Sequence, residues 1–126
     1  MTVSFQKFGI GIDITDIEKF RKLPFSENKN FYKKLFTDSE IKYCLKFKQP
    51  SSHFAGKFAV KEATKKSIHP SISMKNIKTS HSNSKPTISI TNLKNYNFLV
   101  SLSHENNLAV AVVISQKLNS LPTSFT

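Results

Sequence analysis

The stretch Phe54-Ala55-Gly56-Lys57-Phe58-Ala59-Val60-Lys61-Glu62-Ala63-Thr64-Lys65-Lys66 decides the fold. It belongs to the longest helix that the sequence predicts, over residues 52–68, which ends before Pro70. Four of its residues follow one another at intervals of four, three and four and therefore share one helical face: Ala55, Ala59, Glu62 and Lys66. A carboxylate and an ammonium group thus stand on a face that otherwise presents alanines to the core.

The segment that precedes the helices alternates apolar side chains with glycine or aspartate: Phe8-Gly9-Ile10-Gly11-Ile12-Asp13-Ile14. This pattern predicts a strand that ends near Asp13. Shorter helices are predicted over residues 16–23, 31–36 and 38–47. The last of them begins with Thr37-Asp38-Ser39-Glu40, a capping-box sequence, and Pro50 is expected to end it.

Beyond the long helix the chain is rich in β-branched residues separated by Asn, Ser and Lys turns. Strands are predicted over residues 74–79, 86–91, 98–103 and 108–115, with loops at 80–85 and 105–107. The fold class is therefore α+β, with an N-terminal strand and helices followed by an antiparallel sheet packed on the long helix. We expect a single domain over residues 1–118 and a flexible tail over 119–126.

The composition narrows the class of protein further. The 126 residues and 38% hydrophobic content suit one folded domain. No apolar run approaches the roughly 18 residues of a membrane span, and Lys7 and Asp13 interrupt any signal-peptide-like segment at the N-terminus. The single cysteine, Cys44, excludes a disulfide framework and a multi-cysteine zinc site. We expect a reducing cytoplasm as the compartment.

The charge is strongly basic, with 19 Lys and Arg against 8 Asp and Glu, a net charge of +11. Such a balance favours an anionic partner, whether nucleic acid, acidic membrane, phosphorylated small molecule or acidic protein. Eighteen of the nineteen cations are Lys, however, and the compositional bias of an AT-rich genome would produce the same count without any partner. Composition alone leaves these alternatives open.

Two of the acidic residues stand out. Asp13 ends an apolar strand, where a carboxylate is costly unless it is paired or bound to a metal, and Glu62 lies on the alanine face of the long helix. Two carboxylates from separate elements, with lysines nearby, suit a Mg²⁺ site that phosphate oxygens and water complete. A buried ion pair between Asp13 and a lysine is the alternative.

Four segments, taken in order, resemble the small single-domain holo-acyl-carrier-protein synthases, a class of 4′-phosphopantetheinyl transferases. They are residues 9–14, 36–40, 54–66 and 101–104, the last followed by Ala109 and Ala111. Together they span nearly the whole chain. The resemblance implies the 4′-phosphopantetheinyl transferase-like fold, and an enzyme that moves the 4′-phosphopantetheine arm of coenzyme A to a serine of apo-acyl carrier protein. It further implies release of 3′,5′-ADP, Mg²⁺ dependence and a role in fatty acid biosynthesis.

The same resemblance implies roles for individual residues. Asp13 and Glu62 match the magnesium ligands, and Lys66 matches a catalytic lysine that contacts phosphate and assists the leaving group. Glu62 is also a catalytic candidate, because either it or a metal-bound water would be the base for the partner's serine.

Further coenzyme contacts are implied at Lys57, where the family often has arginine, and at His104, which otherwise would only cap a strand turn. Lys85 and Pro86 are implied too, in the turn Asn83-Ser84-Lys85-Pro86, where Ser84 replaces a glycine. A serine there is costly if the turn needs positive φ.

The first helix is implied to dock the acidic acyl carrier protein through Lys19, Arg21 and Lys22. Small members of the family form homotrimers with the site at subunit interfaces, and we expect the same here. The competing hypothesis is a non-catalytic basic module that binds nucleic acid through interleaved lysines and aromatic residues. A single arginine, the lack of a base-reading motif and the core-like spacing of the aromatic residues speak against it, so neither nucleic acid nor membrane is an expected partner.

Overall fold

The computed structural model describes residues 7–118, so the predicted tail at 119–126 lies outside the described residues. The elements follow in this order: β1 (Phe8–Asp16), α1 (Ile17–Arg21), the 3₁₀ turn η2 (Phe25–Glu27), α2 (Lys29–Leu35), α3 (Asp38–Leu45), α4 (Pro50–Ser67), the 3₁₀ turn η3 (Met74–Asn76), β2 (Ile77–Ser82), β3 (Lys85–Ile90), β4 (Tyr96–Glu105) and β5 (Leu108–Lys117).

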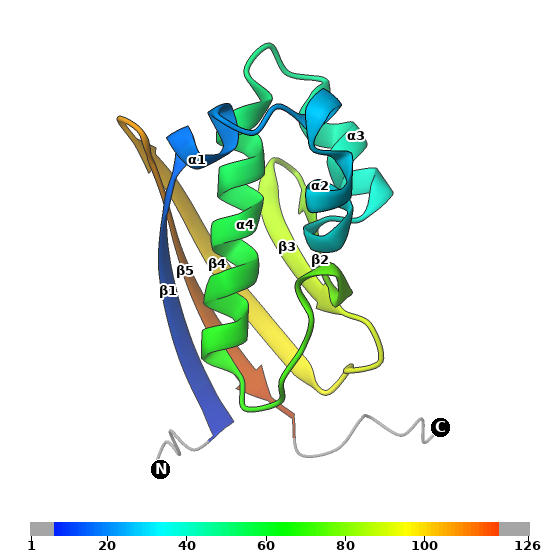
Figure 1. The fold of residues 1–126 in the computed structure, drawn as a ribbon. Coiled ribbons are helices and arrows are strands. Elements are labelled where there is room, and N and C mark those ends of the chain that lie inside the picture. Colours follow the sequence, from blue (N-terminus) through cyan, green and yellow to red (C-terminus); the bar gives the residue numbers. More distant parts are fainter. Residues whose placement is uncertain (1–6, 119–126) are drawn as a thin grey trace.

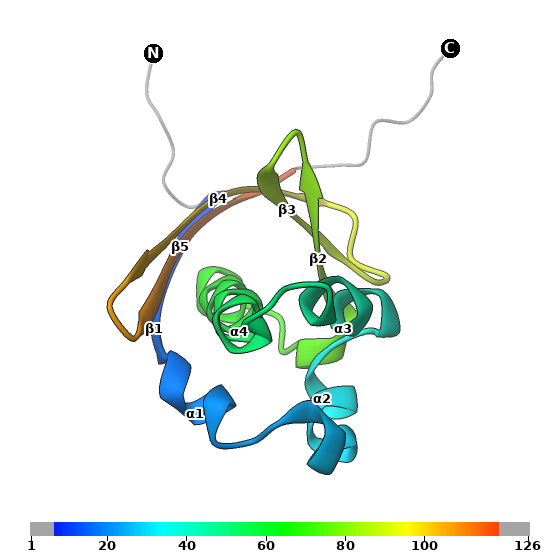
Figure 2. The ribbon, with the colours of Figure 1, turned by 90° about the horizontal axis from the view of Figure 1, so that it is seen from above.

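Helix α4 lies in the hollow of a curved antiparallel sheet whose strand order is β1-β5-β4 (Figure 1). The hairpin β2–β3 forms a separate two-stranded sheet, and helices α2 and α3 lie on the side of α4 away from β1 (Figure 2). The predicted α+β class and the packing of antiparallel strands on the long helix are therefore confirmed. In the part of the chain that is described, no helix is both long and apolar enough to cross a membrane.

Two glycines allow β1 to touch the backbone of α4. A Cβ atom added at Gly9 would stand 1.8 Å from the Ser67 carbonyl oxygen, and one added at Gly11 would stand 1.9 Å from the Ala63 carbonyl oxygen. Both distances are far below van der Waals contact, so no other residue fits at either position. The alternating glycines and isoleucines thus form a strand with two faces. The glycine face, which has no side chains at residues 9 and 11, lies against the helix, and the isoleucines lie on the other face.

A buried ion pair joins α3 to α4. The side chains of Glu40 and Lys61 are 1% and 0% exposed, and Lys61 Nζ donates to Glu40 Oε1 at 2.7 Å. Thr37 N–H donates to the same oxygen, and the backbone N–H and hydroxyl of Thr79, on β2, donate to Oε2. The predicted capping box is present, and its Glu40 also holds three elements together.

The boundaries of several elements differ from those predicted. Strand β1 continues past Asp13 to Asp16, β2 begins only at Ile77, and β4 is longer than predicted at both ends. Helix α4 begins at Pro50 rather than after it, because proline needs no hydrogen-bonded N–H in the first helical turn. The predicted loop over residues 80–85 is wrong, since β2 continues to Ser82 and pairs with Lys85. The turn shrinks to Asn83 and Ser84, which have φ of 52° and 67°, so Ser84 does occupy a conformation that favours glycine.

The buried pair gives a stability prediction. Glu40→Gln should lower the free energy of unfolding by roughly 3–5 kcal/mol, because it leaves the Lys61 charge buried without an anion. Glu105→Gln, at the exposed end of β4, is the matched control and should change it by less than about 0.5 kcal/mol. Urea unfolding measures both, and a Glu40→Gln variant as stable as the control would contradict the account.

The same pair has a defined pH dependence. Burial raises the pKa of Glu40, but the hydrogen bonds from Lys61, Thr37 and Thr79 outweigh burial and keep this pKa below its ordinary value of 4.5. A carboxylate with a lowered pKa stabilises the fold above its ordinary pKa, and that contribution is lost as the pH falls through the folded-state value. The stability difference between the wild type and Glu40→Gln should therefore narrow in acid.

Candidate functional site

The Asp13 carboxylate lies at the seam between β1 and α4, on the face of β1 that carries the two glycines. Its side chain is 15% exposed. Thr15 Oγ1 donates to Asp13 Oδ2 at 2.6 Å, and Lys66 Nζ donates to Oδ1 at 3.3 Å. The alternation of β1 brings Asp13 to this position, because residues 9, 11 and 13 point toward the helix.

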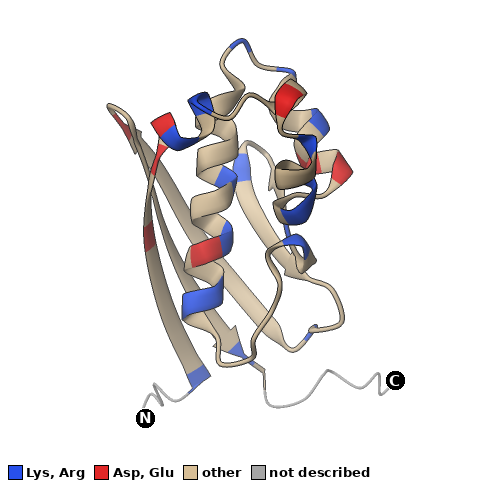
Figure 3. Ribbon diagram, in the orientation of Figure 1, with Lys and Arg blue, Asp and Glu red and all other residues tan. Residues whose placement is uncertain are grey.

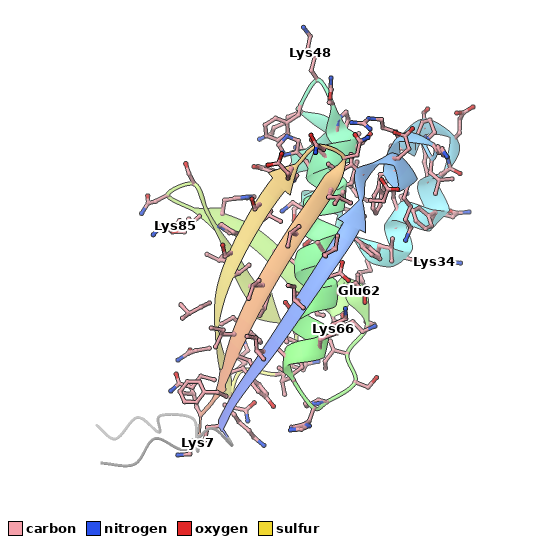
Figure 4. The ribbon with its side chains drawn as sticks, turned by 90° about the vertical axis from the view of Figure 1, so that its left-hand side faces the viewer. Lys7, Lys34, Lys48, Glu62, Lys66 and Lys85 are labelled. Atoms are coloured by element: carbon pink, nitrogen blue, oxygen red, sulfur yellow. The ribbon has the colours of Figure 1, made fainter. Side chains whose placement is uncertain are left out.

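Lys66 spans the seam, since its Nζ also donates to the Ile12 carbonyl oxygen at 3.0 Å. Glu62 lies one helical turn before Lys66, and both side chains leave α4 beside the open edge of β1 (Figure 4). Glu62 is half-buried and Lys66 is exposed. Within residues 7–118 the ion pair of Lys66 is with Asp13 and not with Glu62.

These three side chains suit a hard divalent cation with a phosphate ligand. The oxygen donors are two carboxylates, which is what Mg²⁺ uses when substrate phosphates and water supply the rest of its coordination. The Lys66 ammonium already binds the Asp13 carboxylate, so this carboxylate attracts positive charge. In the described part of the chain there is no cluster of three or more His, Cys, Asp or Glu, so an all-protein metal cage is not formed there.

Lys57 lies on the opposite side of α4. Nine residues separate it from Lys66, which corresponds to a rotation of about 180° and a rise of about 13 Å along the helix. Lys57 is only 6% exposed; its Nζ donates to Thr79 Oγ1 at 2.9 Å and lies 4.8 Å from the centre of the Tyr43 ring. It lines a pocket of about 440 Å³ between α3, α4 and β2.

The other expected coenzyme contacts are also distant from Asp13 in the fold. The His104 imidazole lies over Gly56 and its Nε2 is 3.1 Å from the Ser52 carbonyl oxygen, near the start of α4. Lys85 and Pro86 begin β3, and Lys85 lies beyond the β4 side of the sheet, across from Glu62 and Lys66 (Figure 4). One chain therefore holds two groups of candidate residues: Asp13, Glu62 and Lys66 at the β1 edge, and Lys57, His104, Lys85 and Pro86 elsewhere.

The expected docking residues lie on and just after α1. Lys19 is exposed and its Nζ lies 4.4 Å from the centre of the Phe58 ring. Arg21 pairs with Glu18 at 2.8 Å and donates to the Asn107 side chain at 3.0 Å, and Lys22 is the exposed C-cap. Lys19 and Lys22 thus offer their charge to solvent, whereas that of Arg21 is shared with Glu18.

The outer face of the three-stranded sheet is apolar and open. Ile10, Ile114 and Leu99 form one row across the three strands and are 68%, 38% and 71% exposed. Ile12 and Ile14 extend the patch along β1, at 54% and 61% exposure. Figure 3 shows the strands of this sheet almost free of charged residues, while lysines and arginine gather on the helices. A contiguous apolar surface of this kind is typical of an interaction site.

Sequence reasoning missed several residues of the Lys57 pocket. It treated Glu40 only as a helix cap, although Glu40 neutralises Lys61. It considered Tyr43 only for the nucleic-acid alternative, and it assigned neither His53 nor His81 to any site. The available signal was the spacing of Lys57 and Lys61, four residues apart on the face opposite Glu62 and Lys66. Their partners come from α3 and β2, at separations of 21 and 22 residues, which no local pattern reveals.

Comparison with known proteins agrees with these observations. The family model of the 4′-phosphopantetheinyl transferase superfamily matches residues 9–113. A holo-[acyl-carrier-protein] synthase of Thermodesulfovibrio yellowstonii is 36% identical over 109 residues, which cover 84% of this chain and 96% of the relative.

Solved structures agree as well. A Helicobacter pylori holo-[acyl-carrier-protein] synthase in complex with coenzyme A has a TM-score of 0.72 at 35% identity, with 85% of this chain and 99% of that chain covered. A Bacillus anthracis synthase in complex with CoA (3′,5′-ADP) has a TM-score of 0.74 at 27% identity, with 86% and 96% covered. The chain therefore belongs to the holo-[acyl-carrier-protein] synthase family of enzymes, within the 4′-phosphopantetheinyl transferase superfamily.

Proposed function

We propose that this enzyme takes coenzyme A, transfers its 4′-phosphopantetheine arm to a serine of apo-acyl carrier protein and releases 3′,5′-ADP, in support of fatty acid biosynthesis. The observation that carries the proposal is the contact between Asp13 and Lys66 at 3.3 Å, beside Glu62, in a chain of this family. Two carboxylates and an ammonium group at one open edge suit a diphosphate and its counter-ion.

In the proposed reaction the serine oxygen of the carrier protein forms a bond to the phosphorus that bears the pantetheine arm. The bond from that phosphorus to the bridging diphosphate oxygen breaks, and 3′,5′-ADP leaves with the electron pair. Lys66 stabilises the negative charge that grows on the departing phosphate. Glu62 is within the same group of side chains and accepts the serine proton.

Asp13 and Glu62 are the residues that would hold Mg²⁺. When bound, the ion would neutralise the diphosphate and help to align it. The fit rests on the hard oxygen donors of the two side chains and on the Lys66 ammonium, a cation already bonded to Asp13.

We further propose a homotrimer with each site shared between neighbouring copies. The exposed apolar row of Ile10, Ile114 and Leu99 is a surface that a second copy would cover. The separation of Lys57 and Lys66 on opposite sides of α4 supports sharing, because α4 itself stands between the two groups within one chain.

The acidic acyl carrier protein would dock on α1, with Lys19 and Lys22 as the exposed cations and Arg21 next to them. The net charge of +11 would speed this encounter by electrostatic steering. We place the reaction in a reducing cytoplasm, where Cys44 persists as a thiol. Burial raises the pKa of this thiol to about 12, so it is neither ionised nor reactive at neutral pH.

Mass spectrometry of an apo-acyl carrier protein tests the activity directly. With the enzyme, coenzyme A and Mg²⁺, the carrier should gain the mass of phosphopantetheine. Asp13→Asn and Glu62→Gln should each slow transfer on the order of 100-fold or more, because each removes a ligand of the diphosphate's counter-ion. Glu27→Gln, an exposed carboxylate of η2, is the control. No mass gain with any carrier, or normal turnover by both site variants, would refute the proposal.

Lys66→Ala separates a catalytic lysine from a structural one. If Lys66 meets charge on the leaving phosphate, kcat should fall by an amount equivalent to roughly 2–4 kcal/mol, with a smaller change in the KM for coenzyme A. If its bond to the Ile12 carbonyl only ties β1 to α4, the melting temperature should fall and kcat should not. Lys65→Ala is the neighbouring control. An unchanged kcat would remove Lys66 from the mechanism.

A further inference from the structure

The pocket on the Lys57 side of α4 carries positive charge that its own carboxylate does not neutralise. Its basic lining groups are Lys42 from α3, Lys46 at the C-cap of that helix, Lys57 from α4 and His81 from β2. Glu40 is the carboxylate that reaches this lining. Its Oε1 accepts from Lys61 and Thr37, and its Oε2 accepts twice from Thr79, so Glu40 is fully engaged.

Lys57 is the innermost of these cations. At 6% exposure its ammonium group has a hydroxyl partner, Thr79, and an aromatic partner, Tyr43, rather than a carboxylate. Burial lowers the pKa of Lys57, which is the mark of a charge that lacks full compensation. A buried cation in an open pocket of about 440 Å³ is a receptor for an anion.

The His81 imidazole lines this pocket, and the His53 imidazole lies next to it, packed against the lining residue Tyr43. The His81 ring stacks on Tyr43 with ring centres 4.8 Å apart, and the His53 ring stacks on Phe47 at 3.6 Å and meets the Tyr43 ring edge-on at 6.3 Å. Burial lowers the pKa of both histidines; Lys57 adds to this at His81, and His104, His81 and Lys57 add to it at His53. Without a ligand both rings therefore carry less positive charge near neutral pH than an ordinary histidine.

The proposed substrate supplies an anion of the required kind. Coenzyme A carries a diphosphate, which the proposed function assigns to the Asp13 edge, and a separate 3′-phosphate monoester. A phosphate monoester is close to a dianion at neutral pH. It therefore attracts a buried ammonium group and stabilises the protonated form of a neighbouring imidazole. The Lys57 pocket is a cationic position, separate from Asp13, that suits this phosphate.

We propose that His53 and His81 are additional binding residues for the 3′-phosphate of coenzyme A, and that they take up protons when this phosphate binds beside Lys57. The inference rests on the proposed function, since it takes coenzyme A as the ligand. By linkage, an imidazole that gains a proton on binding makes affinity rise as the pH falls, by as much as tenfold for each unit by which its pKa rises.

Isothermal titration calorimetry counts these protons. Binding of coenzyme A is measured near pH 7 in two buffers of different ionisation enthalpy, and the difference in observed heat gives the protons taken up. Dephospho-coenzyme A, which lacks the 3′-phosphate, is the ligand control. The variants are His53→Phe, His81→Phe and their combination, since phenylalanine keeps each aromatic stack but does not titrate. His69→Phe removes an imidazole that lines a different pocket, beside Lys66, and is the matched control for an imidazole away from Lys57.

The wild type and His69→Phe should take up more protons with coenzyme A than with dephospho-coenzyme A, and the double variant should lose that excess. The affinity ratio of wild type to double variant should rise roughly 3- to 10-fold from about pH 7.5 to about pH 6. Taking this ratio cancels the titration of the phosphate itself. Equal proton uptake by wild type and double variant, or by the two ligands, would overturn the inference.

The two proposals fail separately. If the wild type transfers phosphopantetheine normally but shows no histidine-dependent proton uptake, the histidine inference alone is wrong. If the wild type neither binds coenzyme A nor modifies a carrier protein, the proposed function is wrong and the inference falls with it.

Discussion

The contact between the bare backbone of β1 and the backbone of α4 fixes where the charged side chains meet. Because a Cβ atom at Gly11 would stand 1.9 Å from the Ala63 carbonyl oxygen, strand and helix approach without any side chain between them. The next residue on the same face of the strand is Asp13, which Lys66 therefore reaches at 3.3 Å. The sequence Gly-Ile-Gly-Ile-Asp thus lets the strand pack closely on the helix and also positions the Asp13 carboxylate.

The charges of α4 are divided between its two sides. Toward β1, Glu62 and Lys66 are open to solvent and to a ligand. Toward α3 and β2, Lys61 is neutralised by Glu40, while Lys57 has only a hydroxyl and an aromatic ring. Burying Lys57 without a carboxylate costs folding free energy, and the same lack of compensation makes its pocket a receptor for an anion. Under the proposed function, each chain would contribute two separate groups of coenzyme-binding residues.

The sequence predicted the fold class, the long helix, the capping box and the family, because these depend on local patterns and on an ordered set of segments. Because the chain belongs to a family of enzymes, the hypothesis that its basic composition marks a non-catalytic nucleic-acid-binding module is rejected. The extension of β2 and β4 and the partners of Lys57 and Lys61 were not predictable. They depend on strand pairing and on contacts with α3 and β2 that form only when distant segments meet.

The claim that one site needs two copies has a direct test by mixing subunits. Asp13→Asn should transfer little alone, and Lys57→Ala should transfer little alone at low coenzyme A because it lacks a phosphate contact. The two chains are unfolded and refolded together in equal amounts, and transfer is measured at low coenzyme A. If the two halves come from neighbouring copies of a ring, random assembly leaves about a quarter of the sites intact, so roughly a quarter of wild-type activity should return. Activity no higher than that of the two variants assayed separately would show that the site lies within one chain and contradict the account.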